Sequence, residues 1–334
     1  MVGNGIRRRA CLTWFAAAAA QWTTSWPAVA QDAAAAAAFP NRPIRFLVPY
    51  PPGGGNDFFA RVLSQKMSEN LNQPVVIDNR AGAAGLIAGD ALAKAPPDGY
   101  TIMVDQSSIA TNMLTYKKRQ FDARKDIVPL MLGVTLDNVV LVGSESPVRS
   151  LADLIAQGKR PDSIAYASTG IGSSQHLAME LLCNEAGIKL LHVPYKGTAA
   201  AITALVAGEV QVFIISVPTA QGYIKDGRVR AIATTGLTRS AVMPEVPTVK
   251  ESGFPKFVNV NWLGIFTTRG TPEAVQTRLS AELVKALSDA RVREGLTRQG
   301  WSVEAGPPSA LSKIFEEEIA RYERVVQMGN IRID

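Results

Sequence analysis

Residues 44–63 read Ile-Arg-Phe-Leu-Val-Pro-Tyr-Pro-Pro-Gly-Gly-Gly-Asn-Asp-Phe-Phe-Ala-Arg-Val-Leu and predict a strand, a glycine-rich loop and a helix start in direct succession. The first five residues form an apolar run of strand length. The prolines and glycines of residues 49–55 end regular structure, because proline lacks an N–H and glycine is entropically costly in helices and strands. Asn56 and Asp57 are typical helix N-caps, and the apolar residues after them recur at helical spacing: Phe59, Val62, Leu63 and Met67.

This loop is a candidate anion site. Its backbone N–H groups would lie at the positive end of the following helix dipole, where carboxylates and phosphates are stabilised. For the loop taken alone, the alternative is a strand-to-helix connection that binds no ligand. Asp57 has two possible roles as well, because it could cap the helix or pair with a cationic group on a ligand.

Apolar segments of strand length alternate with helical patterns along the rest of the chain, which predicts an α/β fold of mostly parallel sheets flanked by helices. The strands are expected at 74–78, 100–104, 127–134, 139–142, 163–167, 190–193, 210–215, 229–234 and 258–266. Helices are expected at 150–156, at 198–206, after a cap at Thr271, and at the C-terminal end, where Glu316, Glu317 and Glu318 should form a solvated face.

Residues 163–176 repeat the order of elements seen at the beginning. A strand-like segment is followed by the loop Ser168-Thr169-Gly170-Ile171-Gly172-Ser173-Ser174 and by a helical pattern from Gln175 onward. Two α/β domains facing each other across a cleft would bring both helix N-termini to one ligand. Gln106 and Ser107 end another strand, on the side of the sheet where α/β proteins bind ligands.

The N-terminus has the pattern of an export signal. Arg7, Arg8 and Arg9 form a basic region, a mildly apolar segment follows, and Ala28-Val29-Ala30 is a typical cleavage site. We therefore expect a signal peptide at residues 1–30, cleavage near Ala30, a flexible leader at 31–39 and a periplasmic location, by the general or the twin-arginine route. Removing residues 1–30 lowers the basic count from 35 to 32 against 29 acidic residues, so the formal charge falls from +6 to +3, which does not favour nucleic-acid binding.

The remaining motifs give little support to catalysis or metal binding. Cys183 has only Cys11 as a possible partner, so the mature chain should form no intramolecular disulfide, and the two histidines lack metal-ligand spacing. Gly170-Ile171-Gly172 is half of a dinucleotide motif. Ser173 or Ser174 with His176 could form a nucleophile–base pair, but no orienting carboxylate is implied by the spacing. A hydrolase is thus the alternative from another class, and no cofactor is expected.

An ordered series of motifs resembles the solute-binding receptors of tripartite tricarboxylate transporters, also called Bug-type receptors. The motifs lie at 42–57, 74–82, 97–101, 168–178, 192–197 and 244–253, and the resemblance covers nearly the whole mature chain. Residues 83–88 depart from the family pattern, which more often has a denser glycine run there.

The resemblance implies a two-domain periplasmic-binding-protein fold, type II-like, with the ligand in the cleft between domain 1 (40–138 plus 256–334) and domain 2 (139–255). It implies a monomeric, non-catalytic receptor for a small organic carboxylate, namely a dicarboxylate, an amino acid or an aromatic acid. The partner would be the inner-membrane transporter subunits or, alternatively, a signalling protein. The ligand-binding residues are expected to be Tyr50, Pro52, Gly53, Gly54, Gly55, Asn56, Asp57, Gln106, Ser107, Ser168, Thr169, Gly170, Gly172, Ser173, Ser174, His176 and Ser216, with Thr219 as a further candidate.

Overall fold

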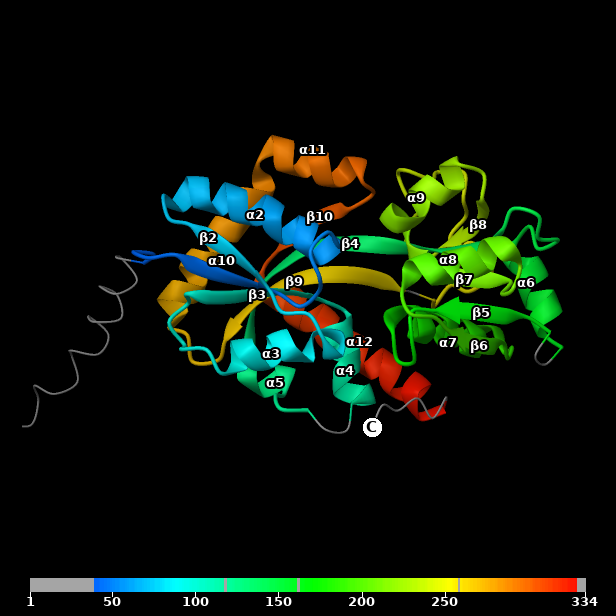
Figure 1. Ribbon diagram of the computed structural model, residues 1–334, viewed down its shortest axis with the longest axis horizontal. Coiled ribbons are helices and arrows are strands. Elements are labelled where there is room, and N and C mark those ends of the chain that lie inside the picture. The colour runs from blue at the N-terminus through cyan, green and yellow to red at the C-terminus, as the bar shows by residue number, and fades with distance from the viewer. Residues whose placement is uncertain (1–38, 117–118, 161–162, 258, 329–334) are drawn as a thin grey trace, which may run out of the picture.

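The computed structural model describes residues 39–116, 119–160, 163–257 and 259–328, and these form two lobes side by side (Figure 1). The expected signal peptide and the leader up to residue 38 lie outside the described residues. No helix within the described ranges is long and apolar enough to cross a bilayer.

Each lobe is built on one mixed sheet. In the first lobe the strand order is β2-β1-β3-β9-β4-β10, and in the second it is β8-β4-β7-β5-β6. Parallel pairs are confined to β2-β1-β3 and β7-β5-β6, whereas the pairs that involve β4 and β9 are antiparallel. The sheets are therefore mixed, and the expectation that they are mostly parallel is wrong. The strands are β1 (Ile44–Val48), β2 (Val75–Asn79), β3 (Thr101–Gln106), β4 (Ile127–Gly143), β5 (Ala165–Ser168), β6 (Leu191–Pro194), β7 (Val212–Ser216), β8 (Val229–Thr234), β9 (Val260–Thr268) and β10 (Ser302–Gly306).

Helices cover the faces of both sheets, so the predicted α/β fold class is confirmed. The first lobe has α2 (Gly55–Leu71), the 3₁₀ turn η1 (Ala83–Gly85), α3 (Leu86–Ala93), α4 (Ser108–Thr115), α5 (Ala123–Asp126), α10 (Glu273–Ser288) and α11 (Ala290–Arg298); the second has α6 (Leu151–Gly158), α7 (Ser174–Ala186), α8 (Thr198–Ala207) and α9 (Val217–Lys225). The expected Thr271 cap of α10 is wrong, because Pro272 occupies the N-cap position and Thr271 Oγ1 donates to the Thr268 carbonyl at 2.8 Å.

Strand β4 runs through both lobes without a break. Two separate strands, at 127–134 and 139–142, were expected here because polar residues interrupt the apolar pattern, and this prediction is wrong. The polar residues that interrupt the apolar pattern lie where β4 passes from the first sheet to the second. Residues 127–137 pair with β9, and residues 138–142 pair with β7. Asn138 is buried at the crossing, where its side chain bonds Asn259 and Asn261 at 2.6 and 2.7 Å.

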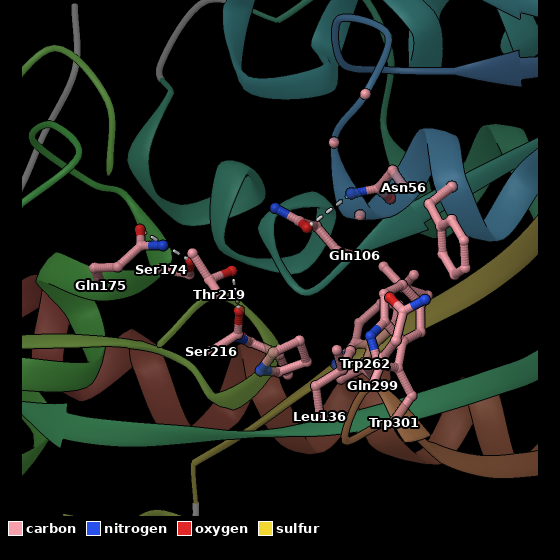
Figure 2. A pocket seen from close by; sticks show the side chains of 17 residues that line it. Asn56, Gln106, Leu136, Ser174, Gln175, Ser216, Thr219, Trp262, Gln299 and Trp301 are labelled. Carbon is pink, nitrogen blue, oxygen red and sulfur yellow. Dashed lines mark hydrogen bonds between the residues drawn. The ribbon is translucent and has the colours of Figure 1, made fainter. Parts of the chain in front are cut away.

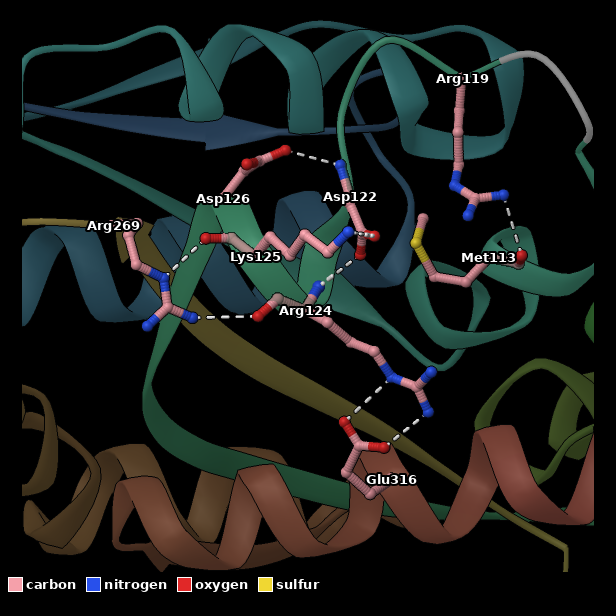
Figure 3. A network of polar contacts seen from close by, with 8 residues as sticks. All are labelled: Met113, Arg119, Asp122, Arg124, Lys125, Asp126, Arg269 and Glu316. Atoms are coloured by element: carbon pink, nitrogen blue, oxygen red, sulfur yellow. Dashed lines mark hydrogen bonds and ion pairs between the residues drawn. The ribbon is translucent and has the colours of Figure 1, made fainter.

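Helix α12 (Pro308–Met328) also extends across both lobes. Its first half places Leu311, Phe315 and Ile319 in a core cluster of the first lobe, and its last turns place Tyr322 and Val326 in a cluster of the second lobe. Figure 3 shows how its outer side is fixed to the first lobe: Arg124 donates twice to the Glu316 carboxylate, at 2.7 and 3.2 Å.

The predicted solvated face of α12 is only partly right. Glu316 and Glu317 are exposed, but Glu318 is buried and accepts a hydrogen bond from Trp262 Nε1. The reason is helical spacing, since a residue three after Phe315 lies on the same face of the helix. Burial raises the pKa of the Glu318 carboxyl to about 8, more than the Trp262 hydrogen bond lowers it.

Candidate functional site

A cavity of about 420 Å³ lies between the two lobes. The first lobe contributes the start of α2, the end of β3 and parts of β4 and β9, and the second lobe contributes the starts of α7 and α9. Its polar lining consists of Gly53, Gly54, Gly55, Asn56, Gln106, Ser174, Gln175, Ser216, Thr219, Asn261 and Gln299, and its apolar lining consists of Phe58, Leu136, Pro218, Trp262, Leu263 and Trp301.

Helix α2 points its N-terminus at this cavity. Its N-cap is Gly54, with no side-chain cap, so the expectation that Asn56 or Asp57 caps the helix is wrong about the position. The first N–H groups of a helix have no partner within the helix, and here those of Gly54, Gly55 and Asn56 belong to residues that line the cavity.

Asp57 fixes the loop before α2. Its carboxylate accepts from the Gly53 N–H at 3.0 Å, from Arg61 Nε at 2.8 Å and from Asn79 Nδ2 at 3.0 Å. The Arg61 hydrogen bond is the largest influence that lowers the pKa of Asp57, to about 2. Asp57 is buried and is not among the cavity-lining residues, so the structure shows neither the N-cap position nor a place in the cavity lining, and its contacts instead hold the loop.

Two helices of the second lobe start at the same cavity. In α7, Ser173 is the N-cap and accepts the His176 N–H, while Ser174 and Gln175, the first two helical residues, line the cavity. In α9, the N-cap is Ser216, whose hydroxyl bonds Thr219 Oγ1 at 2.8 Å rather than a backbone N–H. The cavity therefore receives the positive ends of α2, α7 and α9.

The rest of the expected second loop is occupied with internal contacts. The N–H groups of Gly170, Gly172 and Ser173 donate to Ser168 Oγ, His176 Nδ1 and the Gly170 carbonyl, respectively. None of Ser168, Thr169, Gly170, Gly172, Ser173 and His176 is among the cavity-lining residues. In this region the cavity is thus lined by Ser174 and Gln175, at the start of α7, and not by the loop that precedes them.

Tyr50 and Ser107 lie behind the cavity lining, and Pro52 lies outside it. Tyr50 Oη bonds Ser108 Oγ at 2.6 Å and accepts from Gln106 Nε2 at 3.1 Å, and Gln106 Oε1 in turn accepts from Asn56 Nδ2 at 2.9 Å. Burial raises the pKa of the Tyr50 hydroxyl. This chain of hydrogen bonds orients the side-chain amides of Asn56 and Gln106, which line the cavity.

The geometry around His176 does not match a nucleophile–base pair. Its Nδ1 accepts the Gly172 N–H at 3.0 Å, and its ring stacks on His192 with the centroids 3.8 Å apart. Burial, and then the neighbouring His192, lower the pKa of His176 to about 3. Ser173 Oγ accepts from the His176 backbone N–H. His176 thus supports the loop, and no metal-ligating cluster occurs among the described residues.

The cavity carries no formal side-chain charge. None of its described lining residues is Asp, Glu, Lys, Arg or His. Two acids bond the backbone of lining residues from behind: Asp57 accepts the Gly53 N–H, and Asp105 Oδ1 accepts the Gln106 N–H at 2.7 Å. Burial raises the pKa of the Asp105 carboxyl to about 8, so this group places little negative charge behind Gln106 at neutral pH.

The apolar wall of the cavity was not predicted from the sequence. Figure 2 shows Leu136, Trp262 and Trp301, together with Gln299, gathered on the side opposite to Ser174, Gln175, Ser216 and Thr219. Gln299 and Trp301 come from the connection between α11 and β10, two elements that the sequence patterns did not predict.

Known proteins resemble this chain over most of its length. Residues 59–331 match the sequence model described as tripartite tricarboxylate transporter family receptor. The chain is 41% identical over 291 residues to the "UPF0065 protein in tcbD-tcbE intergenic region" of Pseudomonas sp. strain P51, which covers 86% of this chain and 87% of that protein.

Two solved structures share the fold. That of R. palustris Rpa4515 with adipate has a TM-score of 0.78 and 32% identity, covering 88% of this chain and 99% of that one. That of MatC from Rhodopseudomonas palustris with bound malate has a TM-score of 0.75 and 32% identity, covering 86% and 100%. The chain belongs to the tripartite tricarboxylate transporter receptor family.

Proposed function

We propose that this receptor is exported, with cleavage near Ala30, and captures a small organic carboxylate in the cavity between its lobes for uptake by a tripartite transporter. The observation that carries the proposal is the meeting of three helix N-termini, those of α2, α7 and α9, at a cavity whose described lining has no charged side chain. Solved relatives with adipate and malate support a carboxylate ligand. The contacts of His176 favour binding over hydrolysis.

The anion would be held by backbone N–H groups rather than by an ion pair. Hydrogen bonds to a charged group contribute roughly 1.5–3 kcal/mol each, and a helix N-terminus adds roughly 0.3–2 kcal/mol. Several such contacts account for micromolar binding, about 8 kcal/mol, without burying a lysine or arginine. Because the donors come from both lobes, the ligand would hold the lobes together, and a membrane partner could recognise that state.

One backbone N–H can be removed at the start of α2. Gly55 is the first helical residue, where proline is well tolerated, and Gly54 before it has φ −83° and ψ 172°, which suits a residue that precedes proline. We expect Gly55→Pro to weaken carboxylate binding roughly ten- to 150-fold, since one hydrogen bond to the anion is lost. Isothermal titration calorimetry would measure this, with a ligand chosen from a thermal-shift panel of benzoate, adipate, malate and glutamate.

Gly55→Ala is the matched control. A Cβ at this position would meet Trp301 Cζ2 at 3.6 Å, an ordinary contact distance, and alanine keeps the N–H. The alanine variant should therefore retain most of the affinity. Equal affinity of the proline and alanine variants would count against backbone recognition, and a panel without any stabilising carboxylate would refute the proposed function as a whole.

A further inference from the structure

The cavity has one polar side and one apolar side. The starts of α7 and α9, with Ser174, Ser216 and Thr219, form the polar side, and Trp262 and Trp301 lie on the other (Figure 2). Phe58 is a third aromatic residue of the lining. The phenyl ring of Phe58 meets the indole of Trp301 edge to face, with centroids 5.9 Å apart and planes inclined by 67°. A ligand that fills both sides needs a charged end and a flat apolar body.

The two sides meet at the first turn of α2. A Cβ placed on Gly55 would lie 3.6 and 3.7 Å from two ring carbons of Trp301, so the indole packs directly beside the residue whose N–H faces the proposed anion. A carboxylate at this N-terminus would therefore have its first carbons beside the indole. Trp301 is buried and also stacks on Phe59 at a centroid distance of 5.8 Å, so the ring is fixed in place.

Trp262 is held just as firmly. Its indole N–H donates to the buried Glu318, and its side chain is buried at the cavity wall. The apolar wall is thus preformed by two buried tryptophans of the first lobe.

Possible carboxylate ligands differ in whether they would place a second charged group at the apolar side of the cavity. A second carboxylate of a diacid would face Trp301, Trp262 and Leu136, and the amides of Asn261 and Gln299 and the indole N–H of Trp301 are all uncharged. The ammonium group of an amino acid would find no carboxylate among the described lining residues. Burying either charge without a partner is costly.

We infer that the receptor prefers an aromatic monocarboxylate, with its carboxylate at the helix N-termini and its ring against Trp301 and Phe58. This inference rests on the proposed function. It separates this chain from its relatives solved with adipate and malate, which are dicarboxylates.

A panel of ligands with the complete receptor tests the preference. The aromatic acids are benzoate, phenylacetate and 4-hydroxybenzoate, and the comparison ligands are adipate, malate and phenylalanine. Calorimetry should show at least one aromatic acid binding ten times more tightly than every comparison ligand. If adipate, malate or phenylalanine bound as well as the aromatic acids, the inference would be wrong while the proposed function stood. Failure of every carboxylate to bind would refute both.

Gln299 allows the preference to be changed. It is exposed at the rim of the apolar side, and Gln299→Lys would bring a cation there. We expect adipate to bind at least fivefold more tightly to Gln299→Lys than to the wild type, and the aromatic acids to gain less than twofold. Gln299→Met, of similar length without charge, should not strengthen adipate. If Gln299→Lys left the affinity for adipate unchanged, the second carboxylate of adipate would not lie at the apolar side. That result would overturn the inference.

Discussion

Asn56 lies in the first turn of α2 with 6% of its surface exposed, and its amide is held by Gln106 at 2.9 Å. Among the described residues, no donor reaches Asn56 Oδ1. An aspartate at this position would be nearly isosteric and would suit the positive end of the helix dipole. The helix dipole alone would permit a carboxylate here, but the Asn56 amide also donates to Gln106 Oε1, which a carboxylate could not do. The neutral side chain also fits a neighbour that is itself an anion.

We expect Asn56→Asp to weaken carboxylate binding at least tenfold at pH 7.5. Two like charges about 5 Å apart repel by roughly 3 kcal/mol at an effective dielectric constant near 20. The melting temperature of the free protein should fall, because Asn56→Asp loses the donation to Gln106 and buries a carboxylate, although the helix dipole offsets part of this cost. Calorimetry with the best carboxylate and with its neutral carboxamide would measure the effect. Undiminished carboxylate binding in Asn56→Asp would remove Asn56 from the anion site.

Many polar residues of the cavity could be predicted from local sequence because they follow a strand or start a helix. Gly53, Gly54, Gly55 and Asn56 lie at the opening loop and the start of α2, Gln106 ends β3, Ser174 starts α7 and Ser216 precedes α9. The polar lining residues Gln175, Asn261 and Gln299 were not predicted. The aromatic residues gave no such signal. Trp301 reaches the cavity only because the chain after α11 returns beside α2, and this depends on tertiary packing that no spacing pattern encodes.

At the scale of elements, most predicted strands lie within two residues of the observed ones, because apolar runs bounded by turns are a strong local signal. The errors occur where elements serve both lobes. The polar residues within β4 resemble a turn but mark the crossing between sheets, and Glu318 resembles part of a solvated run but lies on the packed face of α12. In both cases a buried polar side chain, Asn138 in β4 and Glu318 in α12, makes hydrogen bonds inside the protein.

Packing of α12 against β9 predicts a pH effect on stability. With a folded pKa near 8 and an ordinary pKa near 4.5, Glu318 retains its proton in the folded state when the unfolded chain has lost it. Wild-type stability should therefore fall as pH rises from about 4.5 to 8. Glu318→Gln removes this contribution, so its melting temperature relative to wild type should be higher at pH 8.5 than at pH 5.

Differential scanning fluorimetry at the two pH values measures this difference. Glu317→Gln is the control, since Glu317 is exposed on the same helix and should give the same relative melting temperature at both. Asp105, whose pKa is also raised to about 8, is present in all three proteins and cancels in the comparison. A relative melting temperature of Glu318→Gln that did not rise with pH would show that Glu318 is ionised in the folded state.

At the scale of the whole molecule, the two lobes share more than the cavity. Strand β4 belongs to both sheets, and α12 enters a core cluster of each lobe. The predicted domain boundaries at 138/139 and 255/256 assign all of α12 to the first domain, and they remain a prediction. Because α12 contributes Tyr322, Val325 and Val326 to the second core cluster, we expect the lobes to unfold as one cooperative unit.

Two natural probes report on the lobes separately. Trp262 and Trp301 are buried in the first lobe, and the free thiol of Cys183 is buried in the second. Burial is the main cause that raises the pKa of Cys183, to about 12, so the thiol should react only after its lobe opens. A chain that begins at Gln31 lacks Cys11 and the tryptophans of the expected signal peptide. In that chain the thiol signal comes from Cys183, and the tryptophan fluorescence comes from Trp262 and Trp301.

Val326→Asp should uncouple the lobes. The new carboxylate would be buried without a partner in the second core cluster, which should cost roughly 2–3 kcal/mol, and the last turns of α12 would leave that lobe. In a urea titration, Cys183 labelling and tryptophan fluorescence should coincide for the wild type and for Gln327→Asp, an exposed control on the same helix. In Val326→Asp, Cys183 should become reactive at lower urea than the fluorescence change. Coincident transitions in Val326→Asp would mean that β4 alone suffices to couple the unfolding of the two lobes. Separated transitions in the wild type would mean that α12 does not make the lobes unfold cooperatively.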